Sequence, residues 1–356
     1  MRFGKLRHVD NENFLRSKRE VSYSRNVFLP ITNLCRDRCP YCGFRRDPSD
    51  GAWFMSPGEV VRLVERAKNA GCLEALFTLG EKPEVYPEAR KKLGEFGYSN
   101  MVSYLKDLCK QTLKLGLLPH TNAGLLSKRE LRHLRKYNAS MGLMLECAAD
   151  LPVHKGSPSK KPELRLKMIE AAGKLRIPFT TGLLIGIGES REDRIRSLLA
   201  IRKLHERYGH IQEVIIQPFV PKPNTPMADH PRPSYVEILT TVATARSLMP
   251  GMNIQVPPNL VSGVGDLLRA GANDLGGISP LTPDFINPEN PWPTLKEIRS
   301  SIVGAGFVPR ERLPIYPRYA KDPRFMSSEV EARVSQMIDG DGYRRFTDVR
   351  NSLRED

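Results

Sequence analysis

The sequence contains no long hydrophobic run and no block of lysine or arginine. No stretch approaches the roughly eighteen apolar residues that a membrane span requires, and the N-terminal residues MRFGKLRHVDNENF have no apolar core of the secretory type. We therefore expect a cytoplasmic protein with no membrane partner. The net charge of +15 is spread along the chain among acidic residues, and aromatic residues do not interleave with basic ones, so nucleic-acid binding is not favoured.

Cysteine is also scarce, with six in 356 residues, and three of the six lie within NLCRDRCPYCGF, residues 33–44. In a cytosolic chain of this length, a tight cysteine cluster is more typical of metal binding or redox chemistry than of disulfides. The other three, Cys72, Cys109 and Cys147, lie apart in apolar segments. We expect each of them to be a buried structural thiol.

The clustered cysteines are Cys35, Cys39 and Cys42, and no fourth follows for thirty residues. Thiolates select zinc, copper(I) or iron-sulfur clusters. A structural zinc site needs four protein ligands, and His8 is the only close candidate in sequence for the fourth. An iron-sulfur cluster held by three cysteines instead leaves one iron open for a substrate or cofactor. The spacing favours the open cluster, with zinc as the alternative.

Short apolar runs alternate with longer helical patterns along most of the chain. One such unit is the run NVFLPITN, residues 26–33, followed by SPGEVVRLVERAKNAG, where Ser56, Pro57 and Glu59 form a helix start and Gly71 a stop. The other apolar runs lie near residues 73–80, 117–124, 140–146, 178–188, 212–219, 253–260 and 274–279. This alternation predicts an α/β fold, a TIM-barrel-like parallel barrel with all or nearly all of eight units.

We expect an N-terminal segment over residues 1–20, a core barrel over 21–260, and a barrel-completing segment with a helical extension over 261–356. In such barrels the chemistry lies on the loops that follow the strands. Polar or metal-binding residues follow the predicted strands: Cys35, Gly80, Glu81, Asn122, Glu146, Gly186 to Glu189, Gln217, Asn259, Asn273 and Asp274. These side chains are predicted to gather on one rim of the barrel.

The pattern Cys-x3-Cys-x2-Cys, with Tyr41 before the last cysteine and a strand before the first, resembles the signature of radical S-adenosylmethionine (SAM) enzymes. That resemblance implies a 4Fe-4S cluster held by three cysteines, with SAM on the fourth iron as the source of a 5′-deoxyadenosyl radical. Two further segments resemble SAM-binding motifs of the family. They are TLGEKPE, residues 78–84, and TGLLIGIGES, residues 181–190. The implied SAM-binding residues are Gly80, Glu81, Glu146, Gly182, Gly186, Glu189 and Gln217, although a capping role for Glu146 and an edge hydrogen bond for Gln217 are alternatives.

Four segments are similar, in the same order along the chain, to the deazaflavin-forming subunit of FO synthase. They are NLCRDRCPYCGFRRDP, LFTLGEKPE, HIQEVIIQPFVPKPNTPM, and VPPNL with GANDLGGISPLTPDFINPENPWP. The similarity spans roughly residues 20 to 320. It implies cyclisation of 5-amino-5-(4-hydroxybenzyl)-6-(D-ribitylimino)-5,6-dihydrouracil to 7,8-didemethyl-8-hydroxy-5-deazariboflavin (FO), with release of ammonium, methionine and 5′-deoxyadenosine. A partner radical SAM subunit that transfers the 4-hydroxybenzyl group supplies the substrate. Because only one triple-cysteine motif is present, only this second step is expected.

Polar side chains at the predicted rim suit the uracil and polyol parts of that substrate. The candidates are Thr121, Asn122, Asn259 and Asn273, for which helix caps and turns are the alternative roles. His120 is a candidate proton shuttle, with a buried core histidine as the alternative. Ferredoxin or flavodoxin is the implied electron donor, and Arg36, Arg38, Arg45 and Arg46 flank the cysteines, with Asp37 and Asp47 placed to pair with them.

Three alternatives remain from the sequence. Two lie within the superfamily, namely the benzyl-transferring partner subunit and a biotin-synthase-like maturase. The third is a basic, zinc-stabilised nucleic-acid-binding protein, which is expected to be colourless and to bind RNA or DNA with a steep salt dependence.

Overall fold

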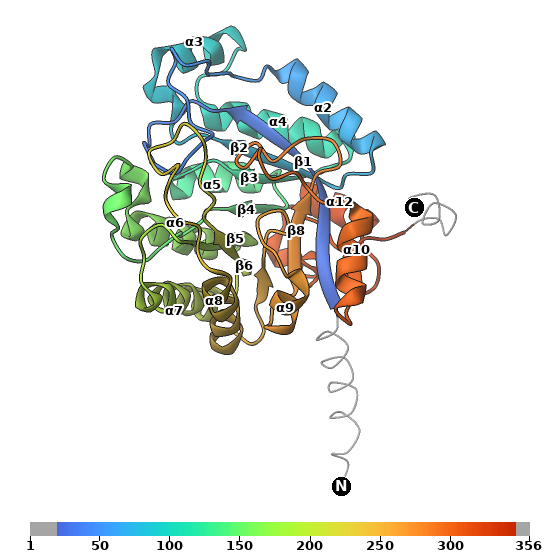
Figure 1. Ribbon diagram of the computed structural model, residues 1–356. Coiled ribbons are helices and arrows are strands. Elements are labelled where there is room, and N and C mark those ends of the chain that lie inside the picture. Colours follow the sequence, from blue (N-terminus) through green and yellow to red (C-terminus); the bar gives the residue numbers. More distant parts are fainter. Residues whose placement is uncertain (1–19, 347–356) are drawn as a thin grey trace.

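Eight parallel strands close into a barrel, and helices surround it (Figure 1). The computed structural model describes residues 20–346. Because β1 (Glu20–Thr32) pairs in parallel with both β2 (Glu74–Leu79) and β8 (Asp274–Ile278), the sheet has no open edge between its first and last strands. The strands between them are β3 (Leu118–Asn122), β4 (Ser140–Gly142), β5 (Phe179–Ile185), β6 (Ile211–Pro218) and β7 (Asn253–Gln255). The predicted TIM-barrel-like fold of eight strands is confirmed.

The helices lie outside the barrel, between successive strands. They are α2 (Pro57–Asn69), α3 (Pro87–Glu95), α4 (Met101–Leu115), α5 (Lys128–Arg135), α6 (Pro162–Lys174), α7 (Arg191–Tyr208), α8 (Tyr235–Leu248), α9 (Val264–Arg269) and α10 (Leu295–Gly304). The predicted start of α2 is confirmed, because Glu59 N donates to Ser56 Oγ at 3.4 Å and Ser56 N donates to Glu59 Oε2 at 2.7 Å. None of the helices in residues 20–346 combines the length and the apolar character of a bilayer crossing.

Alternation along the strands separates the barrel interior from the helix-facing side. On β6, Val214 and Ile216 belong to the hydrophobic core, whereas Glu213, Ile215 and Gln217 face the inside of the barrel. A strand has a side-chain period of two, so this split follows directly from its geometry. Cys72, Cys109 and Cys147 are buried, as predicted from their apolar contexts.

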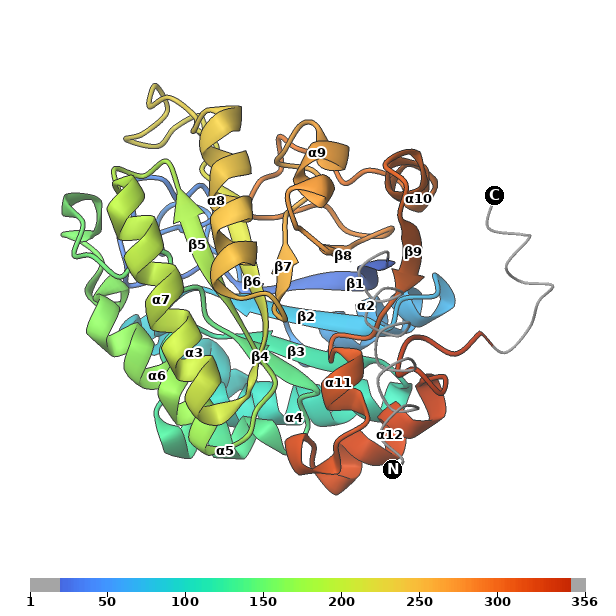
Figure 2. The same ribbon diagram turned by 90° about the horizontal axis from the view of Figure 1, so that it is seen from below.

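The segment 261–356 was expected to complete the barrel and to end in a helical extension, and the structure adds a strand to it. The short strand β9 (Val308–Glu311) pairs in parallel with the start of β1. Beyond it, α11 (Pro317–Ala320) and α12 (Ser328–Met337) pack against Leu73, Leu118 and Ala139, which lie at the starts of β2, β3 and β4 (Figure 2). The C-terminal part thus covers the amino-terminal end of the barrel. His8 and nearly all of the expected segment 1–20 lie outside the described residues.

One placement on the predicted rim was wrong. Asn273 and Asp274 do not follow a strand, because β8 begins at Asp274. Asn273 lies at the amino-terminal end of β8, where its amide Nδ2 donates to Asn253 Oδ1 at 3.1 Å and its Oδ1 accepts from Arg246 Nη2 at 2.9 Å. These contacts connect the loops at the end of the barrel opposite to the cysteines.

Candidate functional site

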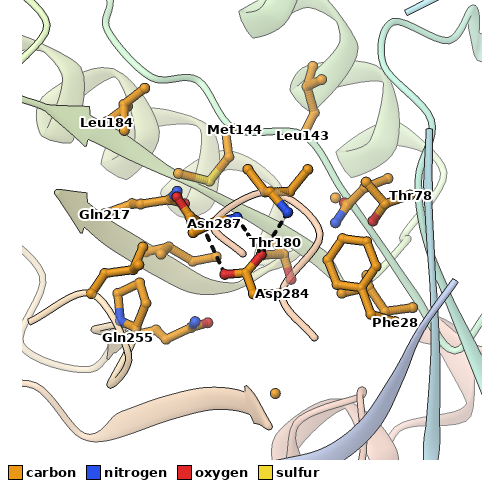
Figure 3. Close-up of a pocket in the computed structure, with 18 of the residues that line it drawn as sticks. Phe28, Thr78, Leu143, Met144, Thr180, Leu184, Gln217, Gln255, Asp284 and Asn287 are labelled. Carbon is orange, nitrogen blue, oxygen red and sulfur yellow. Dashed lines mark hydrogen bonds between the residues drawn. The ribbon is translucent and has the colours of Figure 1, made fainter. Parts of the chain in front are cut away.

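A cavity of about 410 Å³ occupies the barrel interior and opens toward the carboxyl ends of the strands. Figure 3 shows side chains from several strands converging on it, among them Phe28 from β1, Thr78 from β2, Thr180 from β5 and Gln217 from β6. Cavities at this end of a parallel barrel are the usual location of active sites in the fold. The cavity is therefore the candidate active site.

The three cysteines lie in the loop that follows β1, at the mouth of this cavity. Cys42 lines the cavity directly. Cys39 Sγ lies 3.1 Å from Ser157 Oγ, and Glu81 N donates to Cys35 Sγ at 3.1 Å. The loops after β2 and β4 thus each contact one of the thiols.

Several further contacts hold the cysteine loop in place. Arg38 N donates to Gly156 O at 3.1 Å, and Met227 N donates to Pro40 O at 3.2 Å. The carboxylate of Asp37, buried in the loop, accepts from Ser159 N at 3.2 Å. Loops that follow three different strands therefore hold the cysteine loop in this conformation.

The three thiols of the loop match the ligand number of a 4Fe-4S cluster that keeps one iron open. Within residues 20–346 no group of three or more His, Cys, Asp or Glu side chains is arranged to hold a single metal ion. A 4Fe-4S cubane takes one cysteine per iron, so its ligands need not meet at a point. Gly80 allows the close approach of the cysteine loop, since a Cβ there would lie 2.0 Å from Leu34 O and 2.6 Å from Cys35 Cβ.

Burial raises the pKa of Cys35 to about 12 and also raises the pKa of Cys39. Burial therefore favours the protonated thiol form of Cys35 and Cys39 near neutral pH. A cluster bound here would take these side chains as thiolates, so cluster binding would depend on pH.

Glu146 follows β4 at the mouth of the cavity and is held by several partners. Tyr41 OH donates to Glu146 Oε2 at 2.6 Å, and Lys160 Nζ forms an ion pair with Oε1. Burial alone raises the pKa of this carboxyl, but Lys160 and Arg165 overcome burial and hold the pKa well below its ordinary value. Glu146 is thus a charged acceptor beside the cysteine loop, with a φ of 65° that places it in the left-handed region.

The other predicted SAM-binding residues surround the mouth in different ways. Gln217 lines the cavity. Glu81 Oε2 accepts from Leu125 N at 2.8 Å, and the Glu189 carboxylate accepts from Gly186 N and Ile187 N at 2.9 Å each. The Glu81 carboxylate therefore ties the loop after β2 to the loop after β3, whereas the Glu189 carboxylate shapes its own loop.

Gly182 and Gly186, in the motif of residues 181–190, are glycines for different structural reasons. Gly186 has a φ of 92°, which favours glycine. A Cβ on Gly182 would lie 2.2 Å from Ile215 O, so its glycine permits close packing of β5 on β6.

Of the predicted substrate-binding residues, Asn122 and Asn259 line the cavity, whereas Thr121 and Asn273 do not. Thr121 points to the helix side, where its hydroxyl donates to Asn138 Oδ1 at 2.6 Å. Adjacent residues of a strand face opposite sides, so Asn122 and Thr121 cannot both reach the interior.

His120 lies deeper in the cavity than Asn122. Its Nδ1 is 2.6 Å from Ser140 Oγ, and burial lowers its pKa to about 4. The imidazole is therefore neutral near pH 7, and its lowered pKa makes it a weak base there.

Sequence reasoning missed several charged residues of the cavity, namely Glu74, Glu213, Arg312, Lys222 and Asp284. A signal was present for two of them. Glu74 and Glu213 are acids inside the apolar runs EALFTL and IQEVIIQP, in phase with the inward-facing Thr78 and Gln217. Arg312, Lys222 and Asp284 lie in loops, where no periodicity marks the side chains that turn inward.

Comparison with known proteins gives close relatives for almost the whole chain. Residues 29–201 match the Radical SAM superfamily. The chain is 51% identical over 335 residues to the 7,8-didemethyl-8-hydroxy-5-deazariboflavin synthase of Methanopyrus kandleri, covering 91% of this chain and 100% of that protein. It is 53% identical over 327 residues to the protein of the same name from Methanosarcina barkeri, covering 91% of this chain and 99% of that one.

Solved structures of more distant proteins share the fold. A FeFe-hydrogenase maturase, HydG, from Carboxydothermus hydrogenoformans superposes with a TM-score of 0.66 at 19% identity, covering 89% of this chain and 74% of its own. Methylornithine synthase superposes with a TM-score of 0.63 at 20% identity, covering 82% of this chain and 84% of its own.

Proposed function

Because the chain belongs to the family of 7,8-didemethyl-8-hydroxy-5-deazariboflavin synthases, which are radical SAM enzymes, we propose that it catalyses the ring closure that forms FO. The substrate is 5-amino-5-(4-hydroxybenzyl)-6-(D-ribitylimino)-5,6-dihydrouracil, and ammonium, methionine and 5′-deoxyadenosine are released. Membership of this family argues against the zinc-stabilised nucleic-acid-binding alternative.

The observation that carries the proposal is that Cys42 and Glu146 line the same interior cavity as a set of uncharged polar side chains. When bound, the cluster and SAM supply the radical that removes a hydrogen atom from the substrate. Cys35, Cys39 and Cys42 hold the cluster. The barrel wall around the cavity keeps the reacting carbon away from water, which a carbon radical requires.

Residues at the mouth of the cavity would position SAM. We assign this role to Glu146 and Gln217, whose side chains face the mouth, and to the loops that contain Gly80, Glu81 and Gly186. Glu146 is charged and close to the cysteine loop, which suits hydrogen bonds from ribose hydroxyls. Glu81, Gly182 and Glu189 act here mainly by fixing the backbone around the nucleotide.

Asn259 and its neighbours would bind the substrate near the mouth. Asn259 Nδ2 donates to Asp284 Oδ2 at 3.1 Å, while Asn259 Oδ1 is buried without a hydrogen-bond partner among the described residues. Trp292 Nε1, also on the cavity wall, is likewise without one. An acceptor and a donor left open on one wall suit the N–H and C=O edge of a uracil ring.

Two partners follow from the proposed reaction. A 4-hydroxybenzyl-transferring radical SAM subunit supplies the substrate. Ferredoxin or flavodoxin supplies the electron, and we propose that it docks beside the cysteine loop, where the Arg38 side chain is 64% exposed. Asp47 pairs with Arg38 and Arg45, as the sequence predicts, whereas Asp37 is buried against Ser159.

The experiment that tests the proposed function is anaerobic turnover of the reconstituted protein with SAM, a strong reductant and the benzylated uracil adduct. We expect fluorescent FO to accumulate. Formation of the adduct from tyrosine and the ribitylaminouracil would instead identify the partner subunit. No product from either substrate would refute both assignments.

A further inference from the structure

Two hydrogen-bond acceptors lie side by side in the deep part of the cavity. Asn26 on β1 and Glu74 on β2 are register partners across the two strands. Both line the cavity, and both are almost fully buried, at 2% and 6% exposure. Neither residue belongs to the cysteine loop or to the motifs assigned to SAM.

These two side chains retain unused acceptor capacity. Asn26 Oδ1 is buried with no hydrogen-bond partner among residues 20–346. Among these residues, the Glu74 carboxyl accepts one hydrogen bond, which Ser24 Oγ donates to Oε2 at 2.9 Å. Leaving a buried acceptor such as Asn26 Oδ1 unpaired is unfavourable, so a ligand that supplies a donor there gains affinity.

The neighbouring acids, by contrast, are satisfied by the protein itself. Glu213 Oε1 accepts from Thr180 Oγ1 and Oε2 from Tyr316 OH, both at 2.6 Å. Asp274 accepts from Arg312 Nε at 2.6 Å and from Arg312 Nη2 at 2.9 Å. The protein thus satisfies these two acids, whereas Asn26 and Glu74 keep acceptor atoms open to the cavity.

A ligand group that completes this pair must bring two donors and no net negative charge. The N–H donors of the uracil ring alternate with carbonyl acceptors, and the C5 amino group, which leaves as ammonium, belongs to the reacting centre near the mouth. A phenol brings one hydroxyl, but the ribityl chain brings adjacent hydroxyls, each of which is a donor. Because each hydroxyl can also accept a hydrogen bond, the chain suits a site that is polar on all sides, including His120 and Gln255.

The distance from the mouth suits a long substrate. Glu74 begins β2 and Leu79 ends it beside the cysteine loop, so about 16 Å of strand separates the two ends. Between them Phe28, Leu76 and Ile215 form an apolar layer that fits flat rings. The hydroxybenzyl and uracil rings would occupy this layer, with the reacting atoms toward the mouth.

We infer that Asn26 and Glu74 form a subsite for two adjacent hydroxyls of the ribityl chain. The inference rests on the proposed function, because it takes the benzylated ribitylimino-uracil as the ligand. The pair determines which substrates are bound tightly and takes no part in the radical chemistry.

The first test uses the wild-type enzyme, so it does not depend on the folding of a variant. The value of kcat/KM is measured for the ribityl substrate, for the analogue with N-methyl in place of ribityl, and for single-deoxy ribityl analogues. We expect the methyl analogue to be used at least tenfold less well, mainly through KM, since a site built for hydroxyls is left unpaired without them. Loss of either of two adjacent hydroxyls should account for most of this difference.

The second test uses Asn26→Leu and Glu74→Gln, with Glu65→Gln, at an exposed position of α2 outside the cavity lining, as the control. The first two variants should lower the ratio of kcat/KM for the ribityl substrate to that for the methyl analogue by about tenfold. The control should leave this ratio unchanged. Equal use of the two substrates by the wild type, or an unchanged ratio in both cavity variants, would overturn the subsite. Absence of FO from the ribityl substrate with wild-type enzyme would instead refute the proposed function on which the subsite rests.

Discussion

At Gly80, the end of β2 and the cysteine loop come into direct contact. The backbone of residue 80 packs against Leu34 O, and the next amide, Glu81 N, donates to Cys35 Sγ at 3.1 Å. A side chain at residue 80 cannot be accommodated unless the cysteine loop moves. The glycine therefore controls the position of a cluster ligand, in addition to any contact with SAM.

Gly80→Ala is predicted to lower the iron content after anaerobic reconstitution and to reduce 5′-deoxyadenosine formation in proportion. Its added Cβ would lie 2.0 Å from a carbonyl oxygen. Gly94→Ala in α3 is the matched control, because nothing lies within 4 Å of its added Cβ, and alanine favours an exposed helix by about 0.5–1 kcal/mol. Wild-type iron content and activity in Gly80→Ala would contradict this account of the loop.

Titration of the Glu74 carboxyl makes the stability of the folded protein depend on pH, and a single substitution can isolate this effect. Burial raises the pKa of Glu74 to about 7, with Glu213 and Asp274 adding to the effect and Arg312 and Ser24 opposing it. The folded protein therefore holds a proton on this carboxyl over a range where the unfolded chain has lost it. The stabilisation that comes from the raised pKa of Glu74 is fully present below about pH 4. This stabilisation is lost as the pH rises toward about 7.

Glu74→Gln removes this titration. The free energy of unfolding of the wild type, minus that of Glu74→Gln, is predicted to fall between about pH 5 and about pH 8. Urea unfolding of both proteins at several pH values measures this difference. A difference that does not change with pH would show that Glu74 titrates normally in the folded state.

Among the elements, β9 has a role that its length does not suggest. It pairs with the start of β1, and the chain then turns so that Arg312 enters the barrel. The Arg312 guanidinium contacts Asp274 at 2.6 Å and Glu213 at 3.5 Å, and the side chains of all three are almost fully buried. Pairing of β9 with β1 thus places Arg312 where its charge neutralises Asp274 and Glu213 in the barrel interior.

Arg312→Met is predicted to destabilise the fold by about 3–5 kcal/mol, because it leaves buried carboxylates without their cation. Arg324→Met is the control. Arg324 pairs with Asp322, but its side chain is 68% exposed, so its loss should leave the stability almost unchanged. Urea denaturation measures both, and similar values for the two variants would contradict the proposed role of β9.

The sequence predicted a strand or a helix start correctly where a short residue pattern is enough to determine it. The eight barrel strands were found from their apolar runs, and the start of α2 from Ser56 and Glu59. β9 was missed because its four residues, VPRE, carry no apolar period, and pairing with β1 alone makes them a strand. Asn273 was placed at the wrong end of β8 because it precedes the apolar run rather than following it.

At the scale of the whole molecule, the cavity joins three zones that the sequence holds far apart. The mouth comes from the cysteine loop and Glu146, the middle from apolar strand residues, and the deep end from Asn26, Glu74 and the Arg312 cluster. The sequence placed the cysteines and Glu146 together at this rim because each follows a predicted strand. The deep end was not predicted, because its charges become a group only when the barrel closes and β9 brings in Arg312.

The central claim is that three thiolates at this mouth hold a cluster with an iron open to SAM. The most direct test is to reconstitute wild type, Cys42→Ala and Cys109→Ala anaerobically, reduce each with SAM present, and measure bound iron and 5′-deoxyadenosine. We predict iron binding and SAM cleavage for the wild type and for Cys109→Ala, whose altered thiol is buried away from the cavity, and loss of SAM cleavage for Cys42→Ala. A wild-type protein that takes up no iron and forms no 5′-deoxyadenosine, or a Cys42→Ala variant that cleaves SAM as the wild type does, would contradict the account.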